Sequence, residues 1–537
     1  MGGRVCYDGV MSAAELLDVV RRLGLVDPRQ IGATTAAVAR WGPTLASVYA
    51  AAAIRRPRDA ALIDHRGTVR FGDLDARSTG LAKGLRTLDL DRGAHIGLLC
   101  FNHRGFVEAS IAAAKGGWPC VYLNTGFGGP QLAEVCRRER ISALVVDRDL
   151  LQVVAASGFD GHVIVTDVDD AEELHDGLLT FASLRERAPR GPLLPSRPTQ
   201  PILLTSGTTG TPKGARRSNR PSGLSSATGL VERIPYRAGQ TFVIPTPIFH
   251  AWGAAQLALA AVTGSTAVLV RRFAPEPTMD AVVEHRAEVL AAVPVMLQRI
   301  LATAGLADHD TSNLRITACS GSALPASVAL EWMDRYGDNL YNVYGSTEVG
   351  QATIATPRDL REAPGTAGRP ARGSTVRIVD PDGSPVPAGQ VGRILVGNDA
   401  QFEHYTGGGT KERVDGLMSS GDVGYLDDDG RLFVTGRADD MIVSGGENVF
   451  PGEIEELLLT LDQVDDAAVL GVDDAAFGQR LAAYLVLTDG AVLDEEAVRS
   501  FVATQLARHK VPRDVTFIEQ IPRTPTGKIV RRDLPTS

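Results

Sequence analysis

The chain has 537 residues, 44% of them hydrophobic, and a net charge of −9; this length exceeds one compact core and predicts two or more domains. The acidic balance argues against a general nucleic-acid binder, whose footprint would be basic. Five scattered cysteines without a CxxC pair indicate free thiols in a reducing cytosol rather than a disulfide framework or a zinc site.

The first part of the chain alternates between strand and helix patterns. Ser12 and Glu15 are expected to form a capping box ahead of an apolar helical run. A signal peptide is not expected, because a basic segment followed by an apolar run is lacking. Apolar strands are expected at 96–100, 143–146 and 163–165, with helices at 108–114 and 131–138. This alternation predicts an α/β fold with a mostly parallel sheet covered on both faces.

A second α/β unit is expected after the stretch from Pro189 to Pro201, which holds five prolines and reads as a linker. The strands expected next all end in unusual loops; they lie at 202–204, 242–244, 289–293, 316–318 and 340–343. Ligands of open α/β sheets bind beyond the carboxyl ends of the strands, so these loops predict one shared pocket. The uncharged stretch from Ala251 to Val270 is interrupted by glycine and glutamine, which favours a buried helix and strand over a membrane span.

The last third of the chain changes in texture. After about residue 365, short strands with turn signals predict a small antiparallel or barrel-like unit. From residue 439 a final α+β unit is expected, with a helix at 453–461, strands at 467–470 and 482–487, and a helix that opens at Asp494. We therefore expect a large domain over 1–438 and a small mobile domain over 439–537.

The stretch from Leu203 to Arg217 reads LLTSGTTGTPKGARR, an apolar strand that runs into hydroxylated residues and glycines. Glycine lets the backbone pass close to a ligand and turn its amides toward an anion. The side chains suited to phosphate are Thr205, Ser206, Thr208, Thr209, Thr211 and Lys213, and Gly207 and Gly210 lie between them. A flexible surface loop is the alternative. A Walker loop is excluded, because Pro212 precedes Lys213 and Gly214 follows it.

Three later motifs carry residues suited to a nucleotide. In YGSTE, Tyr344 can stack on a purine and Glu348 can hold Mg²⁺, although a packed tyrosine and a solvated glutamate would explain them as well. Asp422 and Arg437 flank a predicted hairpin, where they either bind a ribose or form an ion pair. Lys528 lies in PRTPTGK, which by itself reads as a solvated basic tail.

Taken together, TSGTTGTPKG, YGSTE, SGD, GRADDMI and PRTPTGK resemble the motifs of the adenylate-forming superfamily in order and approximate spacing. The resemblance runs from about residue 45 to Arg532 and points to the acyl-CoA synthetase and fatty-acid–CoA ligase branch. It implies that a carboxylate attacks the α-phosphate of ATP, giving an acyl-adenylate and pyrophosphate. A thiol, usually that of coenzyme A, then takes the acyl group. ATP, Mg²⁺ and coenzyme A are the expected co-substrates.

The resemblance also implies residue roles. The loop from Thr205 to Lys213 would hold the β- and γ-phosphates, Thr347 would contact the α-phosphate, and Glu348 would bind Mg²⁺. The other implied contacts are Ser322, Ala323 and Tyr344 with adenine, Asp422 and Arg437 with ribose, and Lys528 between the carboxylate and the α-phosphate. The small domain would rotate about Asp439, withdrawing Lys528 and bringing in Gly445 and Gly446, whose lack of side chains suits a pantetheine tunnel.

The acid substrate is addressed by the loop PIFHAWG. Amino-acid adenylating relatives usually carry an Asp after the Phe, whereas this chain has His250, so a buried substrate ammonium would lack a partner. The resemblance makes His250 a gate of the acyl pocket, and Gly253, Ala254 and Ala255 are expected to leave room for an alkyl chain. We therefore expect a medium- or long-chain fatty acid.

Three alternatives stay open at this point: an acyl-AMP ligase that loads a carrier protein, an aryl-acid–CoA ligase, and an idle nucleotide-binding regulator. The presence of Lys528, Glu348, Asp422 and Arg437 argues against the regulator. We further expect a cytoplasmic protein with no nucleic-acid partner and no transmembrane segment. Peripheral membrane association and a homodimer are left open.

Overall fold

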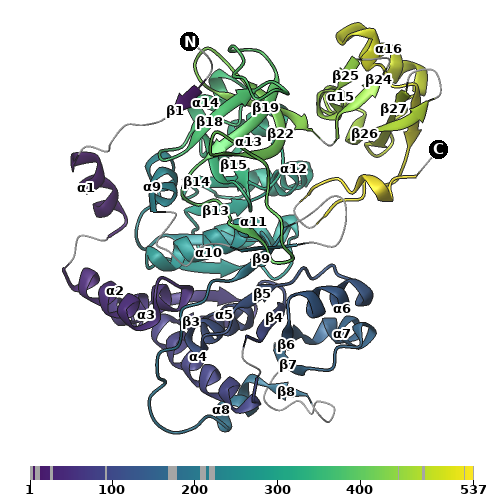
Figure 1. The fold of residues 1–537 in the computed structure, drawn as a ribbon. Coiled ribbons are helices and arrows are strands. Elements are labelled where there is room, and N and C mark those ends of the chain that lie inside the picture. Colours follow the sequence, from purple (N-terminus) through teal and green to yellow (C-terminus); the bar gives the residue numbers. More distant parts are fainter. Residues whose placement is uncertain are drawn as a thin grey trace.

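The structure is a computed structural model in which the described strands form four sheets (Figure 1). It describes residues 4–6, 13–24, 28–90, 93–166, 178–205, 213–216, 224–438, 440–444, 447–474, 478–524 and 527–535. The first helices are α1 (Ala13–Arg22), α2 (Pro28–Trp41) and α3 (Leu45–Arg55). Helix α1 confirms the apolar helical run expected near the N-terminus, whereas Ser12 of the expected capping box lies outside the described residues.

The first sheet has eight strands in the order β20-β10-β9-β5-β4-β6-β7-β8. The strands β4 to β8 are parallel, and β4 is buried over its whole length, as expected of a strand covered on both faces. Their bounds are β4 (His95–Leu99), β5 (Cys120–Tyr122), β6 (Ile141–Asp147), β7 (His162–Thr166) and β8 (Leu179–Thr180). The accompanying helices are α4 (Phe71–Leu85), α5 (Arg104–Gly116), α6 (Gly129–Arg138), α7 (Leu151–Ser157) and α8 (Phe181–Glu186). The predicted alternation is confirmed.

Strand β9 (Ile202–Leu204) belongs to this first sheet and not to the second unit in which we expected it. It pairs in parallel with β5, with Ile202 opposite Val121, and antiparallel with β10 (Gly214–Arg216), which in turn pairs with β20 (His404–Tyr405). Residues 187–201 contain no helix or strand, but they lead back to the same sheet. A three-residue apolar strand suits either buried sheet, so its pattern does not select the partner.

The second sheet has nine strands in the order β17-β16-β15-β14-β13-β11-β12-β2-β3. Its bounds are β2 (Ala60–Asp64), β3 (Gly67–Arg70), β11 (Thr241–Ile244), β12 (Thr266–Leu269), β13 (Val289–Ala292), β14 (Ile316–Ser320), β15 (Leu340–Ser346), β16 (Gly350–Ala355) and β17 (Arg369–Pro370). Its helices are α9 (Leu224–Arg233), α10 (Ala251–Val262), α11 (Pro275–Glu284), α12 (Pro294–Ala302), α13 (Ala326–Tyr336) and α14 (Pro357–Glu362). Strands β11, β13, β14 and β15 are parallel neighbours, so their terminal loops meet at one edge, which confirms the prediction for four of the five strands.

The third sheet is antiparallel, which confirms the change of texture after residue 365. Its strands are β1 (Arg4–Cys6), β18 (Thr375–Val379), β19 (Gly392–Gly397), β21 (Arg413–Val414), β22 (Leu417–Leu426) and β23 (Leu432–Arg437). The N-terminal strand β1 joins its edge beside β18, a pairing that the sequence did not indicate. The pairing of β22 with β23 places Asp422 opposite Arg437.

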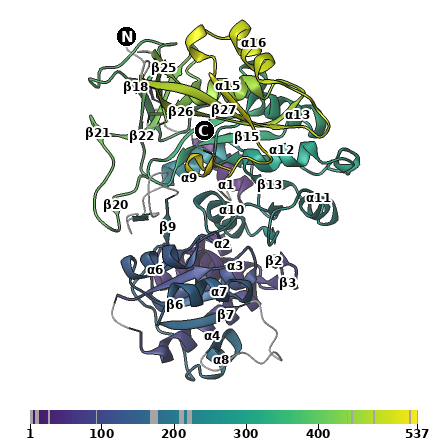
Figure 2. The same cartoon turned by 90° about the vertical axis from the view of Figure 1, so that its right-hand side faces the viewer.

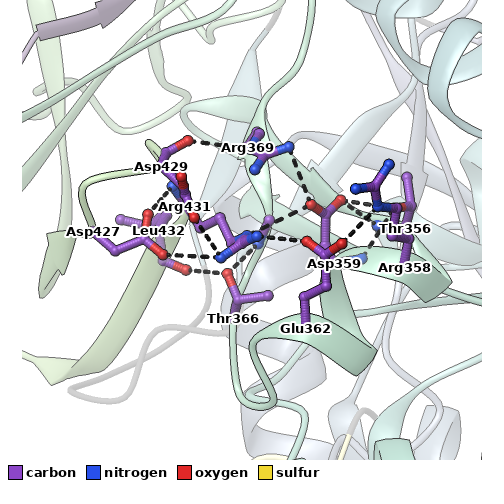
Figure 3. Close-up of polar contacts among 11 residues, drawn as sticks. Thr356, Arg358, Asp359, Glu362, Thr366, Arg369, Asp427, Asp429, Arg431 and Leu432 are labelled. Atoms are coloured by element: carbon purple, nitrogen blue, oxygen red, sulfur yellow. Dashed lines mark hydrogen bonds and ion pairs between the residues drawn. The ribbon is translucent and has the colours of Figure 1, made fainter.

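A network of ion pairs fastens the turn between β22 and β23 to helix α14 (Figure 3). Arg431 contacts Asp429 at 3.0 Å in the turn and Glu362 at 2.6 Å in the helix. Beside them, the Ala367 amide and the Thr366 hydroxyl both donate to the Leu432 carbonyl, at 2.7 Å and 3.0 Å. The network therefore holds the segment 364–368 in place.

The C-terminal unit contains the fourth sheet, in the order β25-β24-β27-β26 with β28 beside β27. Its elements are β24 (Ile442–Ser444), β25 (Glu447–Val449), α15 (Pro451–Leu458), β26 (Val464–Asp474), β27 (Gly478–Leu487), α16 (Glu495–Gln505) and β28 (Asp514–Phe517). Asp494 caps α16 by accepting the Ala497 amide at 2.7 Å, as its sequence position suggested. Figures 1 and 2 show this unit at the far end of the molecule from the first sheet. The boundary at residue 439 stays a prediction, because Asp439 lies outside the described residues.

One hydrophobic cluster joins the first two sheets. It includes Ile96 of β4, Phe106 of α5, Ile244 of β11 and Ala260 of α10, all nearly or fully buried. The stretch from Ala251 to Val270 forms helix α10 and strand β12, as predicted. Among the described residues, no helix combines the length and the apolar character needed to cross a bilayer.

Candidate active site

A cavity of about 1850 Å³ lies where the second sheet, the antiparallel sheet and the C-terminal unit meet. It is lined by all the predicted site residues that the structure describes: Thr205, Lys213, His250, Ser322, Ala323, Tyr344, Thr347, Glu348, Asp422, Arg437 and Lys528. The other predicted residues lie outside the described residues: Ser206, Gly207, Thr208, Thr209, Gly210, Thr211, Asp439, Gly445 and Gly446. Residues up to 323 positions apart, from Thr205 to Lys528, thus converge on one space.

Tyr344, Asp422 and Arg437 form a connected group on one wall. The Tyr344 hydroxyl donates to Asp422 Oδ2 at 2.6 Å, and Arg437 Nη1 lies 3.5 Å from Asp422 Oδ1. Burial raises the pKa of Asp422, while the tyrosine hydrogen bond and the nearby cations Arg437, Lys411 and Lys528 oppose the rise. Both the ion pair and the ribose interpretation are compatible with this geometry, because a carboxylate has about four lone-pair positions and two contacts leave others available.

Glu348 is held on the opposite side of the same motif. Its Oε2 accepts the Ser346 hydroxyl at 3.0 Å and its Oε1 accepts the Tyr405 hydroxyl at 3.0 Å. Two hydroxyl contacts orient the carboxylate without neutralising it, and both oxygens keep further lone pairs. Such a donor set fits a hard cation such as Mg²⁺, which prefers carboxylate oxygens together with phosphate oxygens.

The two described ends of the glycine-threonine loop lie side by side. The Thr205 amide and hydroxyl donate to the Lys213 carbonyl at 2.9 Å and 3.2 Å, which closes the base of the loop between β9 and β10. The Lys213 ammonium lies 5.5 Å from the centre of the Tyr405 ring, at cation–π distance. The loop therefore begins and ends at the cavity wall.

Lys528 reaches the cavity from a tight turn. The Thr524 amide donates to the Lys528 carbonyl at 2.8 Å, and the Gly527 amide donates to the Thr524 carbonyl at 2.8 Å. Arg523 fastens the turn by donating to the Gly527 carbonyl at 2.7 Å and to Asp466 at 2.6 Å. Gly527 has φ +82°, and a Cβ there would lie 2.6 Å from Val295 Cγ1 of α12. Only glycine fits this position, where the turn rests on the large domain.

Lys528 interacts electrostatically both with Asp422 and Arg437 and with Glu348. Burial lowers the pKa of its ammonium, and Arg437 lowers it further, whereas Asp422 and Glu348 raise it. The residue as a whole keeps part of its surface exposed, so solvent weakens these interactions. A cation that lines a cavity near two carboxylates is suited to bind an anionic substrate.

His250 begins helix α10 at the boundary between the polar part of the cavity and an apolar part. Its loop is positioned by Asn102, whose amide donates to the Thr246 carbonyl at 2.9 Å and accepts the Ile248 amide at 2.9 Å. Burial, followed by the Lys528 charge, lowers the pKa of His250 to about 3. Its Nε2 is buried and has no hydrogen-bond partner among the described residues. The imidazole is therefore neutral at physiological pH.

The apolar part of the cavity follows one face of α10. The lining residues on this helix are Ala251, Trp252, Ala255, Ala258, Leu259 and Val262, a spacing that places them on one face. Ala255 lines the cavity, as we expected. Gly253 does not, because it packs against its own loop, where a Cβ would lie 2.4 Å from the Pro247 carbonyl oxygen. Ala254 packs against the core instead. Room for a substrate therefore comes from alanines further along the helix.

Among the lining residues that the sequence analysis did not predict, two polar ones contact the predicted site residues or their neighbours. Tyr405 orients Glu348, and Lys411 donates to the Ser420 carbonyl at 2.5 Å beside Asp422. Both flank the glycine run at 407–409 in YTGGGTK. A lysine after a glycine run is a weak signal in a sequence, because surface loops often have the same composition.

Comparison with known proteins agrees with this geometry. The family model of AMP-binding enzymes matches residues 49–406, and that of the AMP-binding enzyme C-terminal domain matches residues 453–528. Feruloyl-CoA synthase of Amycolatopsis is 32% identical, covering 90% of this chain and 97% of its own. The long-chain-fatty-acid–CoA ligase FadD13 of Mycobacterium tuberculosis is 28% identical, covering 88% and 94%. ATP-bound MatB of Rhodopseudomonas palustris has a TM-score of 0.80 at 26% identity, covering 91% and 97%.

The matches cover both the large domain and the C-terminal unit, including the strands and turns that carry Tyr344, Glu348 and Lys528. ATP, Mg²⁺ and coenzyme A are the co-substrates of this group of ligases. The chain therefore belongs to the AMP-binding enzyme family, as an acid–thiol ligase of the adenylate-forming superfamily.

Proposed function

We propose that this ligase activates a medium- or long-chain fatty acid and transfers it to coenzyme A. The observation that carries the proposal is the division of one cavity into a polar part around Lys528 and an apolar part along α10. An acid with an uncharged tail fits such a division, because its carboxylate meets a cation while its tail leaves water.

In the first step, a carboxylate oxygen attacks the α-phosphorus of ATP, the bond to the bridging oxygen breaks, and pyrophosphate leaves. Lys528 would place its ammonium between the two anions and offset their repulsion. Thr347 would donate to an α-phosphate oxygen, and the segment from Thr205 to Lys213 would hold the leaving pyrophosphate. Catalysis then rests on positioning and charge stabilisation.

The remaining residues of the polar wall would hold the nucleotide. Tyr344 would both face the purine and orient Asp422 through its 2.6 Å hydrogen bond, while Ser322 and Ala323 line the same side. Asp422 and Arg437 would accept and donate hydrogen bonds at the ribose. Glu348 would hold Mg²⁺, which when bound neutralises charge on the phosphates.

In the second step, the sulfur of coenzyme A attacks the acyl carbonyl carbon, its proton passes to solvent, and AMP leaves. We propose that the C-terminal unit rotates about Asp439 between the steps, taking Lys528 out of the cavity and bringing Gly445 and Gly446 toward the thiol path. The Gly527 turn, which rests on α12, marks the adenylation arrangement in this proposal.

The test is a panel of acids with ATP and Mg²⁺, in which AMP release is measured with and without coenzyme A. The panel contains butanoate, octanoate, dodecanoate, hexadecanoate, benzoate and ferulate. We expect dodecanoate or a neighbouring fatty acid to give the highest kcat/KM and AMP release to require coenzyme A. Accumulation of acyl-adenylate that coenzyme A does not discharge would favour a ligase that loads a carrier protein.

An aromatic acid is a second candidate, because feruloyl-CoA synthase of Amycolatopsis is 32% identical over 492 residues. A ring would have to fit beside Trp252, the one aromatic side chain on the lining face of α10. Higher kcat/KM for ferulate or benzoate than for every straight-chain acid would select this candidate.

A further inference from the structure

Helix α1 lines the same cavity as the active-site residues, although it lies before the start of the family match at residue 49. Val19 and Val20 of α1 and Leu23 just after it face the cavity. Val19 and Leu23 are buried, and Val20 is part-buried. The chain thus adds an apolar wall to the pocket from a segment outside the matched domain.

Two contacts fix α1 at a defined place. Arg22 Nη2 donates to the Val231 carbonyl of α9 at 3.2 Å, and the Arg22 carbonyl accepts the Ala238 amide at 2.8 Å. The next residue, Gly239, donates to the Thr263 carbonyl at 3.2 Å, at the carboxyl end of α10. Figure 1 shows α1 beside α9 and separate from α2. Helix α1 therefore packs near the end of α10 that is remote from His250.

The apolar lining continues between these two ends. From Ala251 to Val262 the lining face of α10 spans about 16 Å, at 1.5 Å per residue. Leu230 and Val231 of α9 face the same space. An extended hydrocarbon with bonds of about 1.5 Å advances about 1.3 Å per carbon, so the face matches a tail of about twelve carbons.

We propose that α1 forms the end wall of the acid channel and sets the longest acid that the enzyme accepts. This inference rests on the proposed function, since it assumes that the tail lies along α10. Acids shorter than the channel leave Val20 uncovered, and acids that reach it bury their last carbons against it. A longer acid must displace α1 from α9.

The test is Val20→Phe, which enlarges an apolar side chain of α1 that lines the cavity and adds no charge. We measure kcat/KM for AMP release across butanoate, octanoate, dodecanoate and hexadecanoate. Each buried methylene contributes about fourfold in affinity, so loss of two or more methylene positions should lower kcat/KM for dodecanoate at least tenfold. Values for butanoate should stay within twofold of wild type, because its tail of about 4 Å covers only the start of the lining face and does not reach α1.

Arg21→Phe is the matched control, because Arg21 is the exposed neighbour of Val20 and does not line the cavity. It introduces the same side chain and should leave the chain-length profile unchanged. Val20→Ala is the opposite change and should shift the preferred acid to a longer one. Circular dichroism and thermal melting of each variant report whether it folds, and Val20→Ala decides the question if Val20→Phe does not fold.

The outcomes separate the two proposals. Wild-type enzyme that releases AMP with none of the straight-chain acids contradicts the proposed fatty-acid substrate. Wild-type enzyme with a clear chain-length profile that neither Val20→Phe nor Val20→Ala alters contradicts only the role of α1. An equal shift in Arg21→Phe would also overturn it, because the effect would then come from helix stability and not from the channel.

Discussion

The two parts of the cavity are built in different ways. The polar part is fixed by directional contacts, such as Tyr344 to Asp422 at 2.6 Å and Ser346 to Glu348 at 3.0 Å. The apolar part is a helix face of alanine, leucine and valine with one tryptophan, Trp252, and α1 and α9 lie beside it. Directional contacts specify one set of atoms, whereas an apolar wall selects by size and shape.

The largest effect should come from Lys528→Ala, on the polar part. Loss of the ammonium removes charge stabilisation from the adenylation step, a loss of about 10²- to 10³-fold in rate for a comparable donor. The rate should fall by a similar factor for every acid, because in the proposed function the lysine contacts the carboxylate and not the tail. ATP–pyrophosphate exchange measures this step, and coenzyme A transfer from synthetic acyl-adenylate should remain.

Gly527→Ala is the matched variant, since it keeps the lysine and disturbs only its turn. A Cβ at φ +82° would lie 2.6 Å from Val295 Cγ1, so the turn should dock less well on α12. We expect exchange to fall about tenfold, for a strain of about 1–2 kcal/mol, with transfer from acyl-adenylate preserved. Equal loss of both half-reactions in either variant would contradict the alternation of the C-terminal unit.

A smaller effect should separate nucleotide binding from acid binding. Asp422→Asn removes the charge that Arg437 and Tyr344 contact, and a hydrogen bond to a charged group contributes about 1.5–3 kcal/mol. The KM for ATP should rise at least tenfold. Tyr344→Phe removes only the 2.6 Å hydroxyl contact and should raise the KM for ATP less than Asp422→Asn does, because the carboxylate and its contact with Arg437 remain.

The KM for the acid provides the control for both variants. It should change less than twofold, because neither side chain lies on the lining face of α10. A parallel rise in the KM values for ATP and for the acid would show that the two parts of the cavity are coupled, and would contradict the division between them.

The same contrast explains what the sequence predicts well. Alternating strands and helices, the capping Asp494 and the pairing of Asp422 with Arg437 follow from local patterns, and the structure confirms them. The residues from Thr205 to Lys528 were identified through the motifs that resemble those of the adenylate-forming superfamily, most of which lie at predicted strand ends. All those that the structure describes line one cavity.

Long-range and apolar relations were harder to predict. The placement of β9 in the first sheet depends on its partner β5, which a three-residue apolar strand does not specify. Gly253 looked like room for a substrate, but its missing side chain accommodates the Pro247 carbonyl. The sequence did not identify Val19, Val20 and Leu23 as cavity residues. An apolar helix face has the same sequence pattern whether it covers a core or a channel.

The remaining effect is on stability and concerns His250, at the boundary of the two parts. In the folded protein its pKa is lowered to about 3 by burial and by Lys528, whereas an unfolded histidine has a pKa of about 6.5. Below about pH 6.5 the unfolded chain therefore binds a proton that the folded chain does not. Stability is lost as the pH falls from about 6.5 toward 3.

At pH 5 the loss amounts to about 2 kcal/mol, from about 1.5 pH units at 1.36 kcal/mol each. His250→Gln removes the titrating group, so its melting temperature should fall less than that of wild type between pH 7.5 and pH 5. His509→Gln, at an exposed position outside the cavity lining, is the matched control and should follow wild type. Parallel melting curves for His250→Gln and wild type at both pH values would show that the imidazole can take up a proton where it lies. His250 would then carry a positive charge at low pH, and the apolar part of the cavity would begin further along α10.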